Sequence, residues 1–426
     1  MAEKITAVKG MNDLLPEEIG RFHFVERTAH AVFGRYGFGE VRTPILEKTA
    51  LFVRGVGEET DLVGKEMYSF EDKGGESKSG TLVSLRPEGT APAVRAGIEH
   101  NVFQQDPMVR WYYLGPMFRR ERQQKGRYRQ FSQVGAEIYG VSSPYADAEL
   151  LDSSVAFLSE LGLPDISLEL NSLGDEACRP KYVEALVGYL KGRAADLCPD
   201  CQRRLETNPL RVLDCKVPGC KVVTEGVPEV EAHLCEACKA HYATLLGLLD
   251  SLGIKYRKNP RIVRGLDYYT RTVFECVSQT VGEDGLGSQN TVLAGGRYDK
   301  LVKNLGGPEV PAVGFAAGIE RLAILLAAQK KDFRSPPGLF VAAMDERARQ
   351  RALELASSLR RAGVSVDQDL RGGSLKSQLK RADKCGAKHL IVLGEAELAS
   401  GKAKLKEMTT GEEREVALDG LVEVLR

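Results

Sequence analysis

The sequence predicts an α+β core, an antiparallel sheet with flanking helices, that is interrupted by a helical insertion and followed by a C-terminal α/β domain. Three observations lead to this prediction. A pattern of strand, charged loop and strand occupies residues 110–140. Helical periodicity with clustered cysteines occupies residues 175–258. Short apolar strands alternate with helices after the Pro336–Pro337 pair. We therefore expect core segments at 1–174 and 259–330, an insertion at 175–258, a linker at 331–337 and a last domain at 338–426.

The composition is that of a globular protein. Of 426 residues, 43% are hydrophobic and 28% are charged. Basic and acidic residues balance at 59 each, so any contact with nucleic acid must come from local basic patches. No apolar run is long enough to span a membrane, and the N-terminal segment lacks the apolar core of a signal peptide. Nine cysteines, an odd number, favour a reducing cytoplasm over a disulfide framework.

The first element in chain order is a helix. Pro16 suits its start, apolar residues recur at helical spacing, and Gly37 ends it. The next segment, 39–47, predicts a strand that contains Pro44. Proline inside a strand belongs at a sheet edge or a bulge, so we expect an edge strand there.

A turn containing Glu88 and Thr90 follows a predicted strand at 82–85 and leads to a helix expected to begin near Ala93. A carboxylate and a hydroxyl at a strand end can receive the ammonium group of a substrate. The same two residue types are also common helix caps. The residues alone leave both roles open.

The central hairpin has two different faces. On its second strand, Val134, Ala136 and Ile138 form an apolar face. The opposite face carries an amide, a carboxylate and aromatic rings around Gly135, and a glycine there leaves room for something to lie against the backbone. A buried carboxylate and amide need partners, which a ligand can supply. The intervening loop is dense in basic residues, which indicates either a polyanion or a soluble edge: Arg119, Arg120, Arg122, Lys125, Arg127 and Arg129.

At this point the sequence resembles a known family. The stretch FRRERQQKGRYRQFSQVGAEIYG resembles motif 2 of class II aminoacyl-tRNA synthetases, and in detail that of histidyl-tRNA synthetases. The strand with Pro44 is similar to motif 1, which builds the homodimer interface of that class. RPEGT is similar to the amino-acid-binding turn, RGLDYY and LAGGRY to the two histidine-specific peptides, and GIERL to motif 3. The predicted fold class is therefore that of a class II synthetase.

The resemblance implies a role for each matching residue. Arg119 and Arg264 are the expected catalytic residues, because they would clamp the α-phosphate and the substrate carboxylate. Glu137 and Tyr269 would bind the imidazole nitrogens. The expected histidine-binding residues are Glu88, Gly89, Thr90, Gln133, Glu137, Tyr268 and Tyr269. Phe131 would stack on adenine, and Arg321 would lie on the other side of the adenine ring, near the γ-phosphate. The expected ATP-binding residues are Arg119, Phe131, Arg264 and Arg321. The motif 2 loop would meet the acceptor end of tRNA through Gln124 and Arg127.

Six cysteines in the predicted insertion include two CxxC units: Cys198, Cys201, Cys215, Cys220, Cys235 and Cys238. CxxC pairs suit zinc, but these pairs lie further apart than in a zinc ribbon. Six candidates for four positions also leave the set ambiguous, and Cys178 stands alone before them. A structural metal and free thiols both remain open, and we assign no metal ligand. The resemblance implies that the insertion helps to hold the tRNA acceptor stem.

Residues 338–426 resemble the anticodon-binding domain of class IIa synthetases. One side is basic, which fits either RNA or a solvated helix face: Lys376, Lys380, Arg381, Lys384 and Lys388.

The resemblance implies a histidine–tRNA ligase, a cytoplasmic homodimer that acts on L-histidine, tRNA(His) and ATP with Mg²⁺. Its two steps need positioning and charge neutralisation rather than a covalent enzyme intermediate, which fits a site rich in arginine. The alternative is the regulatory subunit of ATP phosphoribosyltransferase, a non-catalytic paralogue that usually loses catalytic residues and the last domain. Arg119, Arg264 and residues 338–426 argue against it, and RGLDYY argues against a different class IIa synthetase.

Overall fold

A computed structural model describes residues 4–58, 60–73, 80–163, 165–280, 282, 285–287, 290–329 and 331–425. The domain limits predicted at residues 1, 330 and 426 lie outside these ranges. The chain divides into two units, Met1–Asp332 and Phe333–Arg426, each with its own hydrophobic core. Among the described residues, no helix is both long and apolar enough to cross a membrane.

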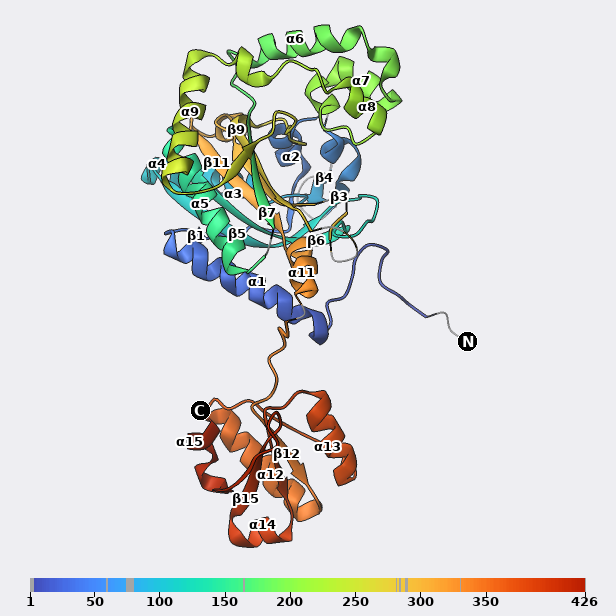
Figure 1. Ribbon diagram of the computed structural model, residues 1–426, viewed down its shortest axis with the longest axis vertical. Coiled ribbons are helices and arrows are strands. Elements are labelled where there is room, and N and C mark those ends of the chain that lie inside the picture. The colour runs from blue at the N-terminus through green and yellow to red at the C-terminus, as the bar shows by residue number, and fades with distance from the viewer. Residues whose placement is uncertain are drawn as a thin grey trace. The chain divides into compact units, whose positions relative to one another are not determined.

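An eight-stranded sheet forms the centre of the first unit (Figure 1). Its strand order is β1-β5-β6-β11-β10-β9-β7-β8. The six inner strands pair in antiparallel fashion, whereas β1 and β8 each join an edge in parallel. The predicted antiparallel core is thus confirmed. The strands are β1 (Gly39–Glu40), β5 (Val109–Phe118), β6 (Gln130–Tyr139), β7 (Ile166–Ser172), β8 (Tyr256–Lys258), β9 (Thr270–Ser278), β10 (Thr291–Arg297) and β11 (Ala312–Gly318).

Three helices cover one face of this sheet. The apolar face of β6 is buried, with Val134 and Ala136 at 0% exposure. On the same face, the ring of Phe33 packs against those of Tyr112 and Phe157. These three helices leave the opposite face of the sheet available for a ligand-binding site. The covering helices are α1 (Pro16–Arg35), α5 (Pro144–Glu160) and α11 (Ile319–Ala328).

Pro44 separates two strands rather than lying inside one, so the prediction of a single strand over 39–47 is wrong. β1 pairs with β5 of the large sheet, whereas β2 pairs with β4 of a separate three-stranded sheet. Proline has no N–H to donate to a ladder, and the chain changes sheets where it stands. The small sheet contains β2 (Leu46–Lys48), β3 (Tyr68–Asp72) and β4 (Thr81–Leu85).

The helix expected near Ala93 begins earlier, at Thr90. The Glu88 carboxylate accepts hydrogen bonds from the backbone N–H groups of Thr90 (2.7 Å) and Ala91 (2.9 Å). It thereby satisfies two of the donors that a helix start leaves unpaired, and Pro92 fits within the first turn. The smaller helices of the core are α2 (Thr49–Val56), α3 (Thr90–Glu99), α4 (Val102–Gln105) and α10 (Leu301–Asn304).

The segment between β7 and β8 is helical and lies over one end of the large sheet (Figure 1). Its buried cysteines belong to the same hydrophobic core cluster as Tyr268, Tyr269 and Tyr298 of the sheet region. The segment is therefore packed onto the core rather than tethered to it. Its helices are α6 (Arg179–Lys191), α7 (Pro199–Thr207), α8 (Pro218–Val223) and α9 (Glu236–Ser251).

The second unit is a five-stranded sheet with helices, in the order β13-β12-β14-β15-β16. β12, β13 and β14 are parallel, as the alternation of strands and helices predicts, and β15 and β16 extend the sheet in antiparallel fashion. The predicted basic residues lie on or just after α13, and four of the five are exposed. The elements are β12 (Leu339–Ala343), α12 (Glu346–Arg361), β13 (Val366–Gln368), α13 (Leu375–Lys384), β14 (His389–Leu393), α14 (Glu395–Ser400), β15 (Lys402–Glu407), β16 (Glu413–Ala417) and α15 (Leu421–Leu425).

Candidate active site

A cavity of about 980 Å³ opens on the sheet face opposite α1, α5 and α11. Ten of the predicted site residues line it, although they come from five separate stretches of the chain: Glu88, Thr90, Arg119, Arg127, Phe131, Gln133, Arg264, Tyr268, Tyr269 and Arg321. Gly89, Gln124 and Glu137 are not among the lining residues. Gln124 is exposed on the hairpin loop, and Glu137 is fully buried.

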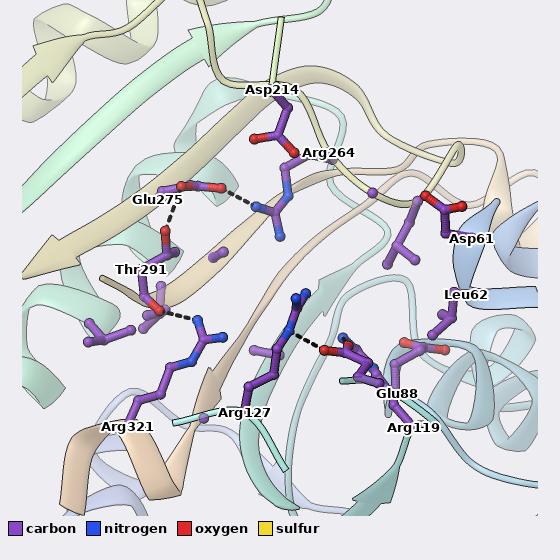
Figure 2. Close-up of a pocket in the computed structure, with 18 of the residues that line it drawn as sticks. Asp61, Leu62, Glu88, Arg119, Arg127, Asp214, Arg264, Glu275, Thr291 and Arg321 are labelled. Atoms are coloured by element: carbon purple, nitrogen blue, oxygen red, sulfur yellow. Dashed lines mark hydrogen bonds and ion pairs between the residues drawn. The ribbon is translucent and has the colours of Figure 1, made fainter. Parts of the chain in front are cut away.

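Six arginines line this cavity, and four of them belong to the predicted site (Figure 2): Arg119, Arg127, Arg264 and Arg321. Arg119 follows β5 and donates from Nε to the carbonyl oxygen of Pro87 at 2.8 Å. Arg127, in the hairpin loop, forms an ion pair with Glu121. Arg264 donates to the carboxylate of Glu275 on β9. Arg321 donates to the carbonyl oxygen of Thr291 on β10 at 2.6 Å.

Arg321 has no acidic partner in the part of the chain that the structure describes. Among the described residues, no carboxylate forms an ion pair with it, and burial together with the charges of Arg127 and Arg119 lowers its pKa to about 10. Its neighbour Glu320 instead accepts hydrogen bonds from the Ser132 backbone N–H at 2.7 and 2.9 Å. Because a buried cation next to other cations is costly, a bound anion would stabilise this arrangement.

The end of the cavity near α3 carries polar groups suited to an ammonium. Both Glu88 oxygens accept backbone N–H groups, and a carboxylate retains further lone pairs for another donor. Burial raises the pKa of Glu88. Gln133 Oε1 is buried and has no hydrogen-bond partner among the residues that the structure describes. An unpaired buried acceptor costs free energy, so a donor brought by a ligand would satisfy Gln133.

Glu137 lies behind the cavity wall at 0% exposure. Its carboxylate accepts hydrogen bonds from the hydroxyls of Thr90 (2.8 Å) and Tyr113 (3.1 Å), and also from that of Tyr298. Burial raises its pKa to about 8 despite these donors, with the charge of Glu88 acting in the same direction. Thr90, which lines the cavity, therefore connects Glu137 to the cavity wall through its hydroxyl.

Gly135 does not leave space for a ligand, contrary to the prediction. A Cβ on Gly135 would lie 2.3 Å from Cζ of Tyr113, and one on Gly89 would lie 2.2 Å from the same ring. Gly135 and Tyr113 are cross-strand partners in the β5–β6 hairpin. The glycines are needed because the tyrosine ring packs over both backbones, which brings its hydroxyl to Glu137.

Phe131 is covered by the protein's own arginine. The Arg119 guanidinium lies 5.2 Å from the centre of the Phe131 ring, a cation–π distance. Arg321, which we expected on one side of a ring stacked there, hydrogen-bonds to the carbonyl oxygens of Gly126 and Thr291.

The profile of histidyl-tRNA synthetases matches residues 10–197 and 201–322, most of the first unit. The chain belongs to the histidyl-tRNA synthetase family. The profile of the anticodon-binding domain matches residues 338–426. The histidine–tRNA ligase of Geobacter metallireducens is 51% identical over 415 residues, covering 97% of this chain and 98% of its own. That of Anaeromyxobacter dehalogenans is 52% identical over 421 residues, covering 98% of both chains.

Solved structures agree with this family. The apo histidyl-tRNA synthetase of S. aureus superposes with a TM-score of 0.80 at 37% identity, covering 99% of this chain and 100% of its own. A structure from Bacillus halodurans C, described as an ATP phosphoribosyltransferase regulatory subunit/histidyl-tRNA synthetase, has a TM-score of 0.64 at 21% identity and shares the fold. Both profiles match, and relatives near 50% identity align over almost their whole length, so this chain is a synthetase rather than the regulatory paralogue.

Motif reasoning missed residues that support the histidyl-tRNA synthetase site from behind. Tyr298 and Tyr113 hold Glu137, and Glu275 holds Arg264. Buried Arg297 binds Asp147, whose pKa it helps to lower to about 2 against the effect of burial. Two of these residues, Arg297 and Tyr298, belong to the LAGGRY peptide, but the prediction used only the glycines of that peptide.

Proposed function

We propose that this enzyme activates L-histidine with ATP and transfers the histidyl group to the 3′ end of tRNA(His). The observation that carries the proposal is the convergence of Arg119, Arg127, Arg264 and Arg321 on one cavity whose other end offers buried acceptors. A polyanion and a small cationic amino acid are the complementary ligands.

The amino acid would lie at the α3 end. Its ammonium group would donate to Glu88, to Gln133 Oε1 and to the Thr90 hydroxyl, which are all on the cavity wall. The imidazole would reach toward Tyr269 and Glu137. Such a site rejects apolar analogues strongly, because they would leave buried polar groups unpaired. Gly89 and Tyr268 shape the same end through backbone and ring packing.

ATP would lie across the arginines. In the first step a carboxylate oxygen of histidine attacks the α-phosphorus, the bond from that phosphorus to the bridging oxygen breaks, and pyrophosphate leaves. Arg119 and Arg264 would neutralise the charge that develops at the α-phosphate. Phe131 would stack on adenine after Arg119 moves from its face toward the phosphate. Arg321 would meet the γ-phosphate, an anion that would offset the burial and the neighbouring positive charges that lower its pKa.

In the second step the terminal ribose hydroxyl of tRNA attacks the carbonyl carbon of the mixed anhydride, and AMP leaves. Gln124 and Arg127 on the hairpin loop are our candidates for the contact with the acceptor end. The second unit, by its family, would hold the anticodon.

Mg²⁺ suits the donor chemistry of the cavity. It is held in proteins by one or two carboxylates together with substrate phosphates, and Glu121 and Glu275 both line the cavity. They would hold the ion by exchanging part of their pairing with Arg127 and Arg264. The ion would supply further neutralisation of the phosphates.

We also propose a homodimer in a reducing cytoplasm. All nine cysteines are free. On the small sheet, Leu46 and Phe70 share one face and are each 48% exposed, an apolar surface that a second copy would cover. Phe70→Glu should yield a monomer in analytical ultracentrifugation, whereas Leu82→Glu on the opposite face should not. A dimer that survives Phe70→Glu would place the interface elsewhere.

Pyrophosphate exchange tests the activity. With labelled pyrophosphate and ATP, label should enter ATP in the presence of histidine and of no other standard amino acid. Exchange driven by a different amino acid, or none with histidine, would reject the proposal.

A further inference from the structure

The cysteines of the helical segment separate into two clusters in the folded chain. The first contains Cys198, Cys201, Cys215 and Cys220, and the second contains Asp175, Cys178, Cys235 and Cys238. Within each cluster the four ligand atoms all lie within 4.8 Å of one another. Among the described residues these are the groups with such geometry, and each takes one of the two CxxC units.

The first cluster has the geometry of a tetrahedral thiolate site. Zn–S bonds of about 2.3 Å at tetrahedral angles place sulfurs about 3.8 Å apart, and Cys198 Sγ and Cys215 Sγ lie 3.9 Å apart. The Cys198 backbone N–H also points at Cys220 Sγ, 3.2 Å away, a contact that stabilises a thiolate. Cys201, Cys215 and Cys220 are buried, so water does not compete strongly for the site.

The second cluster repeats the arrangement with a carboxylate. Cys178 Sγ lies 3.4 Å from Asp175 Oδ1, and Cys235 Sγ lies 3.9 Å from it. The Asp175 backbone N–H points at Cys178 Sγ at 3.3 Å. Cys178 and Cys235 precede α6 and α9 directly, as Cys198 precedes α7, and helix N-termini favour thiolates. Both clusters therefore combine cysteines at helix N-termini with a backbone N–H that points at a sulfur.

We propose that both clusters bind structural Zn²⁺, the first through four cysteines and the second through three cysteines and Asp175. Thiolate sulfur in tetrahedral sets selects zinc among the divalent ions. The first ion would join the two ends of segment 198–220, which carries Arg204, Arg211 and Cys215 on the cavity wall. The second would join the end of β7 to the starts of α6 and α9. Together they would hold the helical segment in place beside the active site.

Zinc content of the intact protein tests the proposal. Protein expressed in zinc-supplemented medium and purified without chelator should contain two zinc ions per chain by elemental mass spectrometry. Native mass spectrometry of the same sample should show both ions on one chain. An organomercurial that blocks thiols should release both ions, which a metallochromic dye records.

Variants separate the two sites. Cys198→Ser with Cys215→Ser should lower the content from two to one, and Cys178→Ser with Cys238→Ser should do the same. Cys385→Ser, a cysteine of the second unit, should keep two. Protein expressed in cobalt-supplemented medium should show thiolate-to-cobalt charge-transfer absorption. Each double variant should reduce the intensity of this absorption by about half.

The zinc content and the thiol state of the wild-type protein test the proposal even if a variant does not fold. Less than one zinc per chain, or disulfide-linked pairs within the clusters in peptide mapping of freshly purified protein, would overturn the proposal. One zinc per chain that only the first double variant removes would overturn it for the second cluster.

Discussion

At the residue scale, the site depends on buried polar groups whose partners are incomplete. Within the described part of the chain, Gln133 Oε1 and Arg264 Nε are both buried without a hydrogen-bond partner, and Arg321 has no acidic partner. Such groups cost free energy in the empty enzyme. Binding a ligand that pairs with them would recover it, which converts a stability cost into affinity.

Arg264→Ala should cut adenylate formation on the order of 10²-fold or more, because it removes charge neutralisation at the phosphate. Stability should change little, because Glu275 keeps the Thr291 hydroxyl at 2.9 Å and is 23% exposed. Single-turnover adenylate assays and thermal unfolding measure the two effects. Arg257→Ala removes an arginine–carboxylate pair outside the cavity and is the matched control. Equal losses of folding and activity in the Arg264 variant would make this residue structural.

Glu137 should make stability fall as pH rises. The folded state retains its proton up to about pH 8, whereas the unfolded carboxyl releases it near 4.5. The folded state therefore binds more protons between these values, and the free energy of unfolding decreases through the window, by at most about 1.4 kcal/mol per pH unit. Glu137→Gln should flatten the slope, measured by urea unfolding from pH 5 to 8. Exposed Glu71→Gln should leave it unchanged, and equal slopes in all three proteins would contradict the assignment.

At the element scale, the β5–β6 hairpin contributes both to the core and to the cavity. One face of β6 packs on the helices, the other faces the cavity, and its loop brings Arg127 back over the site. Within that loop, Gln124 and Arg127 exchange backbone hydrogen bonds at 3.1 and 3.0 Å. The loop is therefore a tight turn in which one residue points inward and the other is exposed.

This division predicts separate effects on the two reaction steps. Arg127→Ala should slow pyrophosphate exchange, because the residue lines the cavity. Gln124→Ala should leave exchange unchanged and lower the rate of transfer to tRNA by several-fold, about the effect of one lost hydrogen bond. Rapid-quench measurements of each step provide the comparison. If Gln124→Ala slows both steps equally, the loop acts as one unit on adenylate formation.

At the scale of the whole molecule, the cavity belongs entirely to the first unit, and the second unit has its own core. Adenylate formation should therefore need the first unit alone. Binding of tRNA should need both, because two linked contacts on one RNA multiply their affinities through effective concentration.

A fragment of residues 1–332 should retain pyrophosphate exchange within a few-fold of the full chain. Its kcat/KM for tRNA charging should fall on the order of 10²-fold or more. Exchange and charging assays on the two proteins measure both effects, with circular dichroism to establish that the fragment is folded. Charging that survives the deletion would show that the acceptor end alone carries recognition.

Sequence patterns predicted most elements, and their errors came from contacts that hydrophobic periodicity does not describe. The hairpin and the strand–helix alternation after residue 338 follow from hydrophobic periodicity, which is a property of neighbouring residues. Residues 39–47 were predicted to form one edge strand, but the chain changes sheets at Pro44, and which sheet each half joins depends on distant strands. The helix at Thr90 began early because its cap, Glu88, binds backbone from outside the helix.

The family and the residue types of the site follow from short contiguous motifs: motif 2, motif 3 and the RGLDYY peptide. Folding was needed to reveal that Tyr113 fills the space over Gly135, that the Thr90 hydroxyl binds Glu137, and which cysteines lie together. Those facts depend on cross-strand register and on contacts between residues far apart in the chain. No spacing along the sequence encodes them, since cysteines 37 residues apart, Cys198 and Cys235, join different clusters while Cys178 and Cys235, further apart, share one.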